Sequence, residues 1–133
     1  MTQEDKEILL KDLCARLPYG VKISVNNNTE SLQGINVLDN IVEYGSFLSS
    51  NIEEVKPYLF PLSSMTEEQE DEWYEVFVDP LSKKLDRHTR QEDLQLQADA
   101  QAFGIEYLLK NHFDIYGLIP MGLAIDATNL NIY

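Results

Sequence analysis

The spacing of apolar residues changes near Gly20 from the period of a helix to that of a strand, and this change constrains the fold most. Four apolar residues before that point follow the spacing i, i+3, i+4, i+7: Leu10, Leu13, Cys14 and Leu17. They predict the buried stripe of an N-terminal helix over residues 2–17, with Thr2 as its cap. Pro18 ends this helix, because proline disfavours helical geometry in the residue before it.

Residues 21–60 show the two-residue period and the turn signals of an antiparallel β-meander. Apolar and polar residues alternate over residues 21–25, and three asparagines follow, which predicts a hairpin turn because Asn tolerates positive φ. Further strands are expected over residues 31–38, 41–44 and 47–48, with a turn at Asp39 and Asn40. The proline-rich residues 56–61 predict an edge strand or an extended linker, since proline cannot donate to a central ladder.

Residues 66–111 are predicted to be a largely helical region. Thr66 and Gln69 match a capping box that opens a helix reaching about Val78. The apolar face of this helix, which we expect to dock on the sheet, comprises Trp73, Val76 and Phe77. A mobile connection over 81–90 and a further helix over 91–110 complete the region.

The mixed C-terminal segment, residues 112–133, is apolar enough to be held against the rest of the chain. Asp114 is expected to cap a short helical turn that ends near Gly122, and residues 123–125 and 130–133 are candidates for added strands. The whole pattern predicts one α+β domain over 1–133. It consists of a small antiparallel sheet of three to five short strands with about three helices packed on one face.

The charge of the chain restricts its partners. The sequence has 23 Asp and Glu against 10 Lys and Arg, a formal net charge of −13, and residues 65–79 contain seven acidic residues and no basic one. Direct binding to nucleic acid or to an anionic membrane is not expected, because both depend on basic side chains. The chain lacks an apolar run of ~18 residues, its N-terminus is not a signal peptide, and Cys14 is its single cysteine. These features predict a cytoplasmic protein.

The acidic segment holds the candidate partner-binding residues. Helical spacing places four carboxylates on one stripe, next to an aromatic residue that is a candidate contact: Glu68, Asp71, Glu72, Glu75 and Tyr74. A solvated helix face is the structural alternative to a docking surface for a basic protein. A nucleic-acid mimic is another alternative. A calcium loop is not predicted, because alternating ligands and the glycine of its sharp turn are missing.

Two arrangements of reactive side chains are candidates for catalysis. His112 lies two residues before Asp114, which could orient an imidazole as a general base, and Cys14 could pair with His112 as a nucleophile. The structural alternatives are a histidine at a helix C-terminus and a buried, inert thiol on the apolar stripe. The sequence has no phosphate loop, nucleophile elbow or zinc spacing. No catalytic residue, cofactor or metal ligand is therefore assigned.

A resemblance is carried by three segments: LKDLCARLPYGV over residues 10–21, KPYLFPLSSMTEEQ over 56–69 and HFDIYGLIPMGLAIDATNLNIY over 112–133. The chain resembles a family of short uncharacterised proteins encoded by phages and mobile elements of gut bacteria. The resemblance implies an accessory genetic origin and a cytoplasmic setting, and no activity, cofactor or site residue comes with it.

Together these observations predict a non-enzymatic accessory protein that binds another protein with a basic surface, through the acidic helix face. A small enzyme that uses His112 with Asp114 or Cys14 is the alternative from a different class. The oligomeric state is left open by the sequence.

Overall fold

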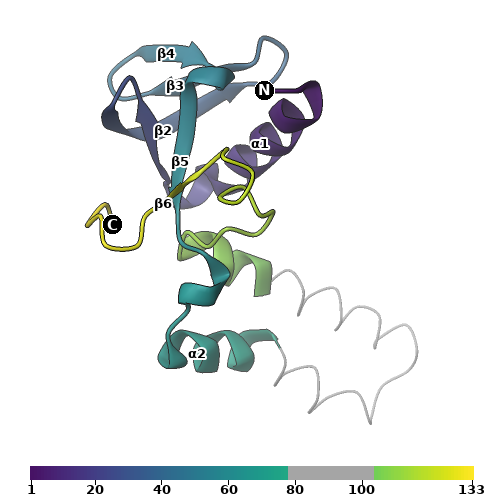
Figure 1. The fold of residues 1–133 in the computed structure, drawn as a ribbon, viewed down its shortest axis with the longest axis vertical. Coiled ribbons are helices and arrows are strands. Elements are labelled where there is room, and N and C mark those ends of the chain that lie inside the picture. The colour runs from purple at the N-terminus through teal and green to yellow at the C-terminus, as the bar shows by residue number, and fades with distance from the viewer. Residues whose placement is uncertain (78–103) are drawn as a thin grey trace.

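The fold is known from a computed structural model, which describes the backbone of residues 1–77 and 104–133 and the side chains of 1–73 and 104–133. Within these ranges the chain has the predicted α+β class, with one six-stranded sheet in the order β4-β3-β2-β1-β5-β6 (Figure 1). This sheet has one strand more than the three to five predicted, and it is mixed rather than purely antiparallel. The strands are β1 (Lys22–Val25), β2 (Asn28–Asn36), β3 (Ile41–Tyr44), β4 (Leu48–Asn51), β5 (Val55–Leu59) and β6 (Ile125–Asp126). All neighbours are antiparallel except β5 and β6, which are parallel.

The helix α1 (Gln3–Arg16) packs against the sheet and confirms the predicted N-terminal helix. Thr2 and Asp5 form a reciprocal capping box at its start. The core joins this helix to the strands and to the C-terminal segment through Leu9, Leu10, Leu13, Val21, Ile23, Val25, Leu32, Val42, Tyr44, Ile52, Val55, Leu59, Leu118, Leu123 and Ala124. The Lys6 ammonium also pairs with the Glu53 carboxylate at 2.8 Å, which links α1 to the short turn that precedes β5.

The meander follows the predicted turns, with two shifts in strand position. Asn26 and Asn27 have φ of 51° and 65°, and Asn40 has φ of 55°, so asparagines take the left-handed turn positions as expected. The second strand begins at Asn28 rather than at residue 31. Phe47 was expected in a strand but lies in the turn between β3 and β4.

The expectation of an edge strand or linker over residues 56–61 is wrong, because β5 lies between β1 and β6. Proline is accommodated by the pairing geometry of this strand. Pro57 stands opposite Ile23, and since proline has no N–H this must be a non-hydrogen-bonded position of the ladder. On the opposite edge of β5, the strand β6 pairs only with Tyr58 and Leu59. The pairing with β6 therefore does not need an N–H from Pro57 either.

The helix α2 (Glu67–Phe77) lies beyond the end of β5 rather than on the sheet (Figure 1), which corrects the expected docking. Its predicted capping box is confirmed, since Thr66 Oγ1 accepts from Gln69 N–H at 3.2 Å and Gln69 Oε1 accepts from Thr66 N–H at 2.9 Å. Trp73 lines a hollow together with Leu62, Met65 and Leu108. The side chains of Val76 and Phe77, and the predictions made for residues 78–103, lie outside the described residues.

The helical residues 104–110 end in a Schellman motif. Phe113 N–H donates to the Leu108 carbonyl at 2.9 Å and His112 N–H donates to the Leu109 carbonyl at 3.1 Å. His112 occupies the left-handed position of the motif, with φ of 63°, where glycine is usual. This places His112 at a helix C-terminus, the structural alternative considered for it.

The C-terminal segment runs back along the end of β5. Phe60 pairs with Phe113 in an isolated parallel bridge, and Ala127 N–H donates to the Leu59 carbonyl at 2.8 Å. Of the candidate strand over 123–125 only Ile125 is in a strand, as the first residue of β6, and the candidate strand over 130–133 is irregular. The expectation that this segment is held down is confirmed by these contacts.

Candidate functional site

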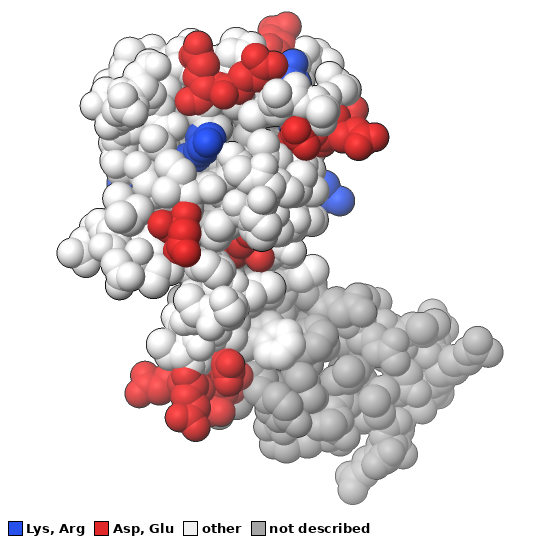
Figure 2. All heavy atoms as spheres, viewed as in Figure 1, with Lys and Arg blue, Asp and Glu red and all other residues white. Residues whose placement is uncertain are grey.

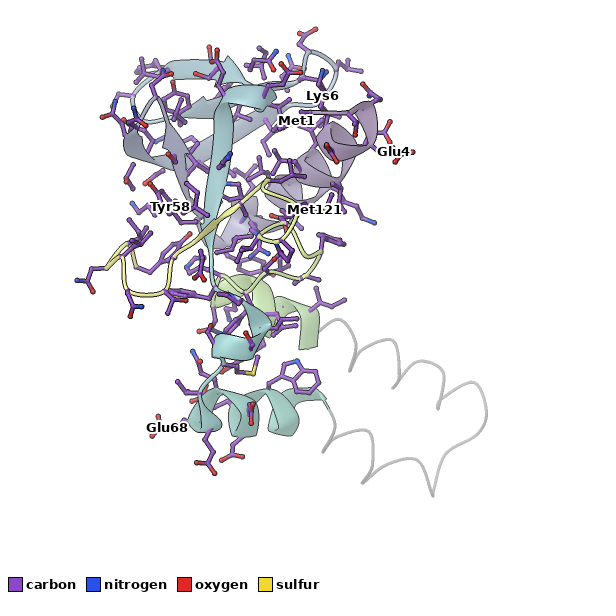
Figure 3. All side chains as sticks on the ribbon, in the orientation of Figure 1. Met1, Glu4, Lys6, Tyr58, Glu68 and Met121 are labelled. Carbon is purple, nitrogen blue, oxygen red and sulfur yellow. The ribbon has the colours of Figure 1, made fainter. Side chains whose placement is uncertain are left out.

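The carboxylates of α2 form an exposed acidic surface. The side chains of Glu67, Glu68, Glu70, Asp71 and Glu72 are all exposed. Figure 2 shows the acidic side chains of α2 gathered at one end of the molecule, and Figure 3 shows Glu68 pointing away from the helix. Tyr74 and Glu75, the other predicted contacts, belong to α2, and their side chains lie outside the described residues. We refer to Glu67, Glu68, Glu70, Asp71 and Glu72 as the α2 acidic surface.

One carboxylate of this surface is engaged within the molecule. The Tyr107 hydroxyl donates to Glu72 Oε2 at 2.7 Å, which joins α2 to the helical residues 104–110. Desolvation, followed by the hydrogen bond to Glu72 and the charge of that carboxylate, raises the pKa of Tyr107 to about 12. Tyr107 therefore stays protonated and remains a donor at neutral pH. Glu72 contributes to holding the helix, and Glu68 and Asp71 remain as the exposed members of the predicted stripe.

An apolar hollow adjoins the α2 acidic surface. It has a volume of about 450 Å³ and is lined by Leu62, Met65, Glu70, Trp73 and Leu108. Glu70 belongs to both features and places a carboxylate among apolar walls. The hollow and the carboxylates are thus two parts of one surface, with room for an apolar group beside a cationic one.

His112 and Asp114 do not act on each other in the way that a catalytic pair would. Both carboxylate oxygens of Asp114 accept backbone N–H groups, from Leu118 at 2.8 Å and from Ile119 at 3.0 Å, so Asp114 holds the start of the following turns. Residues 118–122 form turns rather than the short helical turn that was predicted. His112 Nδ1 is buried and has no hydrogen-bond partner among the described residues. Burial and the nearby Arg16 charge lower the pKa of His112 to about 4, so the imidazole is neutral at neutral pH.

The thiol of Cys14 is exposed, which overturns the expectation of a buried cysteine. Leu10 and Leu13 of the predicted stripe are buried, but the buried face of α1 is centred one residue earlier and also contains Leu9 and the charged pair Asp12 and Arg16. Cys14 instead lines a surface hollow of about 240 Å³ with Glu7, Leu10, Lys11 and Val37. His112 lies elsewhere, stacked on Tyr133, so the described contacts do not include a Cys14–His112 pair.

The sequence did not identify a fully buried ion pair in α1. Arg16 Nε donates to Asp12 Oδ2 at 2.8 Å and Arg16 Nη2 donates to Asp12 Oδ1 at 3.0 Å, and both side chains are 0% exposed. Arg16 Nη2 also donates to the Phe113 carbonyl, which ties α1 to the C-terminal segment. Desolvation raises the pKa of Asp12, and Arg16 opposes that shift. The i, i+4 spacing of opposite charges was the available signal.

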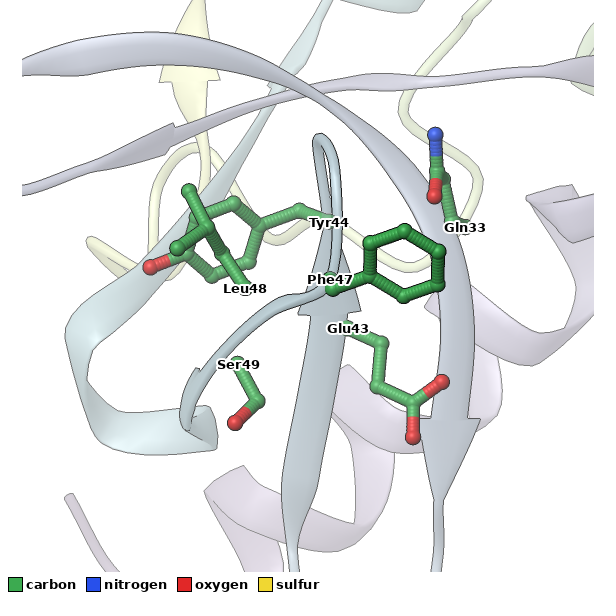
Figure 4. A pocket seen from close by; sticks show the side chains of 6 residues that line it. All are labelled: Gln33, Glu43, Tyr44, Phe47, Leu48 and Ser49. Carbon is green, nitrogen blue, oxygen red and sulfur yellow. The ribbon is translucent and has the colours of Figure 1, made fainter.

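A second surface that the sequence did not indicate lies at the turn between β3 and β4. The Phe47 side chain is fully exposed, and the residue has a φ of 67°. A hollow of about 380 Å³ lies beside it, lined by Gln33, Glu43, Tyr44, Phe47, Leu48 and Ser49 (Figure 4). The sequence predicted a strand position for Phe47, and its exposure follows only from the tertiary structure.

The described part of the chain holds no group of three or more His, Cys, Asp or Glu side chains arranged to bind a metal ion. Within the same part, each helix is too short or too polar to cross a membrane. Comparisons with protein-family models, with curated proteins and with solved structures each gave no match.

Proposed function

We propose that this protein is a non-enzymatic accessory protein that binds a basic, amphipathic segment of another protein at the α2 acidic surface. The observation that carries the proposal is the direct contact between exposed carboxylates and the apolar hollow, which meet at Glu70. Glu68 and Asp71 would receive Lys or Arg side chains of the partner, and the walls formed by Met65 and Trp73 would receive an apolar side chain.

The two parts of the surface have different roles in binding. Exposed carboxylates attract a cationic partner over a distance and orient it, while burial of an apolar group provides most of the affinity. A solvated helix face would account for the exposed carboxylates but not for the apolar hollow beside them. The adjoining hollow therefore favours a docking surface over a solvated face. The nucleic-acid mimic needs carboxylates from several elements at the phosphate spacing of a duplex, whereas this cluster belongs to one helix.

The accessory role and the cytoplasmic setting are part of the same proposal. The exposed thiol of Cys14 supports a reducing compartment, because exposed cysteines oxidise readily outside one. The resemblance of three segments to proteins of phages and mobile elements supports the accessory role.

The test is a selection of binding peptides from a random library, with the full chain as bait. The double variant Glu68→Gln/Asp71→Asn removes two charges from the α2 acidic surface, and Glu4→Gln/Glu54→Gln removes two exposed charges elsewhere as the matched control. We expect basic peptides with interleaved apolar residues. Their affinity should fall about tenfold in the α2 variant and at 0.5 M salt, where screening is strong.

Two results would count against the proposal. The first is enrichment of peptides without basic residues, or of none. The second is equal loss of affinity in the α2 variant and in the control, since total charge rather than the α2 acidic surface would then determine binding.

A further inference from the structure

The strand β4 is an open edge of the sheet. It is the terminal strand in the described sheet, and its inner side pairs with β3. Ile52 N–H donates to the Asn40 carbonyl, so by the alternation of an antiparallel ladder the pairs Val42–Ser50 and Tyr44–Leu48 are the hydrogen-bonded ones. The N–H and C=O groups of Ser49 and Asn51 therefore point away from β3, toward solvent.

This edge lacks the usual protection against pairing with another chain. Edge strands are commonly blocked by lysine, proline or a bulge, or are very short. β4 reads Leu-Ser-Ser-Asn and contains neither lysine nor proline, and the irregular register of the sheet lies between β2 and β3 instead. The opposite edge, β6, is only two residues long. Of the two described edges, β4 is thus the one that can receive a further strand.

An exposed apolar pair stands at the start of this edge. Phe47 is fully exposed and Leu48 is 51% exposed. Phe47 also holds a left-handed φ that is rare for a bulky residue, and such strain is typical of residues kept for a function rather than for packing. Because the ring of Phe47 is not part of the core, the fold itself gains nothing from an aromatic residue at this position.

The charge around the turn between β3 and β4 indicates what kind of chain would pair with β4. Glu43 lines the hollow beside Phe47 (Figure 4), and the Glu30 carboxylate lies so close to Gly45 that a Cβ there would be 3.0 Å from it. A second copy of this chain would bring the same carboxylates and a net charge of −13 to the contact. Like charges on paired strands are destabilising, which favours a basic chain over a second copy.

We propose that β4 binds an extended, basic segment of a partner protein as an added β-strand, with an apolar residue of that segment against Phe47 and Leu48 and a lysine or arginine beside Glu43. The N–H and C=O groups of Ser49 and Asn51 would hydrogen-bond to its backbone, and the hollow would select its side chains. This surface is separate from the α2 acidic surface and does not depend on the function proposed for it.

The test uses the full chain and a ten-residue peptide in which lysine and valine alternate, at low salt. Ser49→Pro removes an N–H that points to solvent and leaves the bonds to β3 in place, while Ser49→Ala keeps that N–H and is the matched control. Phe47→Gly removes the aromatic ring. We expect about tenfold weaker binding for Ser49→Pro and for Phe47→Gly, the strength of one net hydrogen bond or one apolar anchor. Ser49→Ala should bind like the wild type. The difference between Ser49→Pro and Ser49→Ala should persist in the Glu68→Gln/Asp71→Asn background, where binding at the α2 acidic surface is weakened.

Hydrogen exchange provides a readout that does not depend on the folding of a variant. The amides of Ser49 and Asn51 should exchange more slowly in the wild type when the peptide is bound. The proposal is overturned if the peptide does not bind, if these amides are not protected, or if Ser49→Pro binds as well as Ser49→Ala. Sedimentation that shows a dimer dispersed by Ser49→Pro would also overturn it, by identifying a second copy as the occupant.

Discussion

The imidazole of His112 lies parallel to the phenol ring of Tyr133, with ring centroids 3.6 Å apart and 9° between the planes. The same phenol connects three parts of the chain. Its hydroxyl donates to the Tyr58 carbonyl at 2.8 Å and accepts from Lys22 N–H at 2.9 Å. Tyr133 thereby links the end of one helix to strands β1 and β5, although it is 44% exposed.

Loss of the Tyr133 hydroxyl should therefore destabilise the fold measurably. We expect Tyr133→Phe to lower the free energy of unfolding by about 1 kcal/mol, since the hydrogen bonds are lost and water replaces them only in part. Tyr133→Ala should cost a further ~1 kcal/mol, because the stack on His112 is also lost. Urea denaturation measures both values. Equal stability of Tyr133→Phe and wild type would show that the hydroxyl is solvated.

Acid should destabilise the protein through His112. Burial, with the nearby Arg16 charge, lowers the pKa of His112 to about 4 in the folded state, against about 6.5 in the unfolded chain. Between these values the unfolded chain binds a proton that the folded chain does not. The stability that His112 contributes is therefore complete above pH 6.5 and is lost as the pH falls toward 4. Because the ring is only half-buried, solvent screening limits the effect to about 1–2 kcal/mol.

The variant His112→Asn separates this effect from the titration of the carboxylates. Asparagine tolerates the left-handed φ of this position and does not titrate. The difference in free energy of unfolding between wild type and variant, measured from pH 7 to pH 4.5, should shrink as the pH falls. A difference that is constant with pH would disprove the prediction.

The buried pair Asp12 and Arg16 should be costly to break and cheap to replace. Arg16→Met leaves a buried carboxylate without its partner, and we expect a loss of about 3–5 kcal/mol. The double variant Asp12→Leu/Arg16→Met removes both charges and should recover most of that loss. A double-mutant cycle by urea denaturation measures the coupling. The prediction is contradicted if the double variant loses as much free energy of unfolding as Asp12→Leu and Arg16→Met lose together.

Phe47→Gly should raise the stability of the protein. Relief of the left-handed φ gains about 1–2 kcal/mol, and the greater freedom of glycine in the unfolded chain offsets about 0.5–1 kcal/mol of this gain. The matched control is Leu38→Gly, at an equally exposed turn residue without positive φ, which should be neutral or destabilising. A rise in melting temperature for Phe47→Gly alone is the expected result.

The sequence predicted those parts of the fold that local chemistry determines. The helix cap at Thr2, the capping box at Thr66 and the asparagine turns all depend on interactions within about four residues, and all three are present. The α+β class follows from the same local periods. The place of β5 within the sheet was not predictable in this way, because it depends on two residues of β6 far along the chain.

The burial of charged residues was the main obstacle to predicting the surface correctly. Asp12 and Arg16 occupy core positions that an apolar stripe would fill, so the stripe read from apolar residues alone was displaced and Cys14 was placed inside. The exposure of Phe47 was not predicted either, because a large aromatic residue in a meander is more often buried than exposed.

The contact of Arg16 with the Phe113 carbonyl also has a consequence for synthesis. The ribosome releases α1 and the first five strands long before residue 113 exists, and during that time the guanidinium has only its Asp12 partner and water. Closure of the core around this pair must wait for the last fifth of the chain. A nascent chain stalled before that point therefore exposes its meander, with the open β4 edge, to whatever chaperone or partner is near.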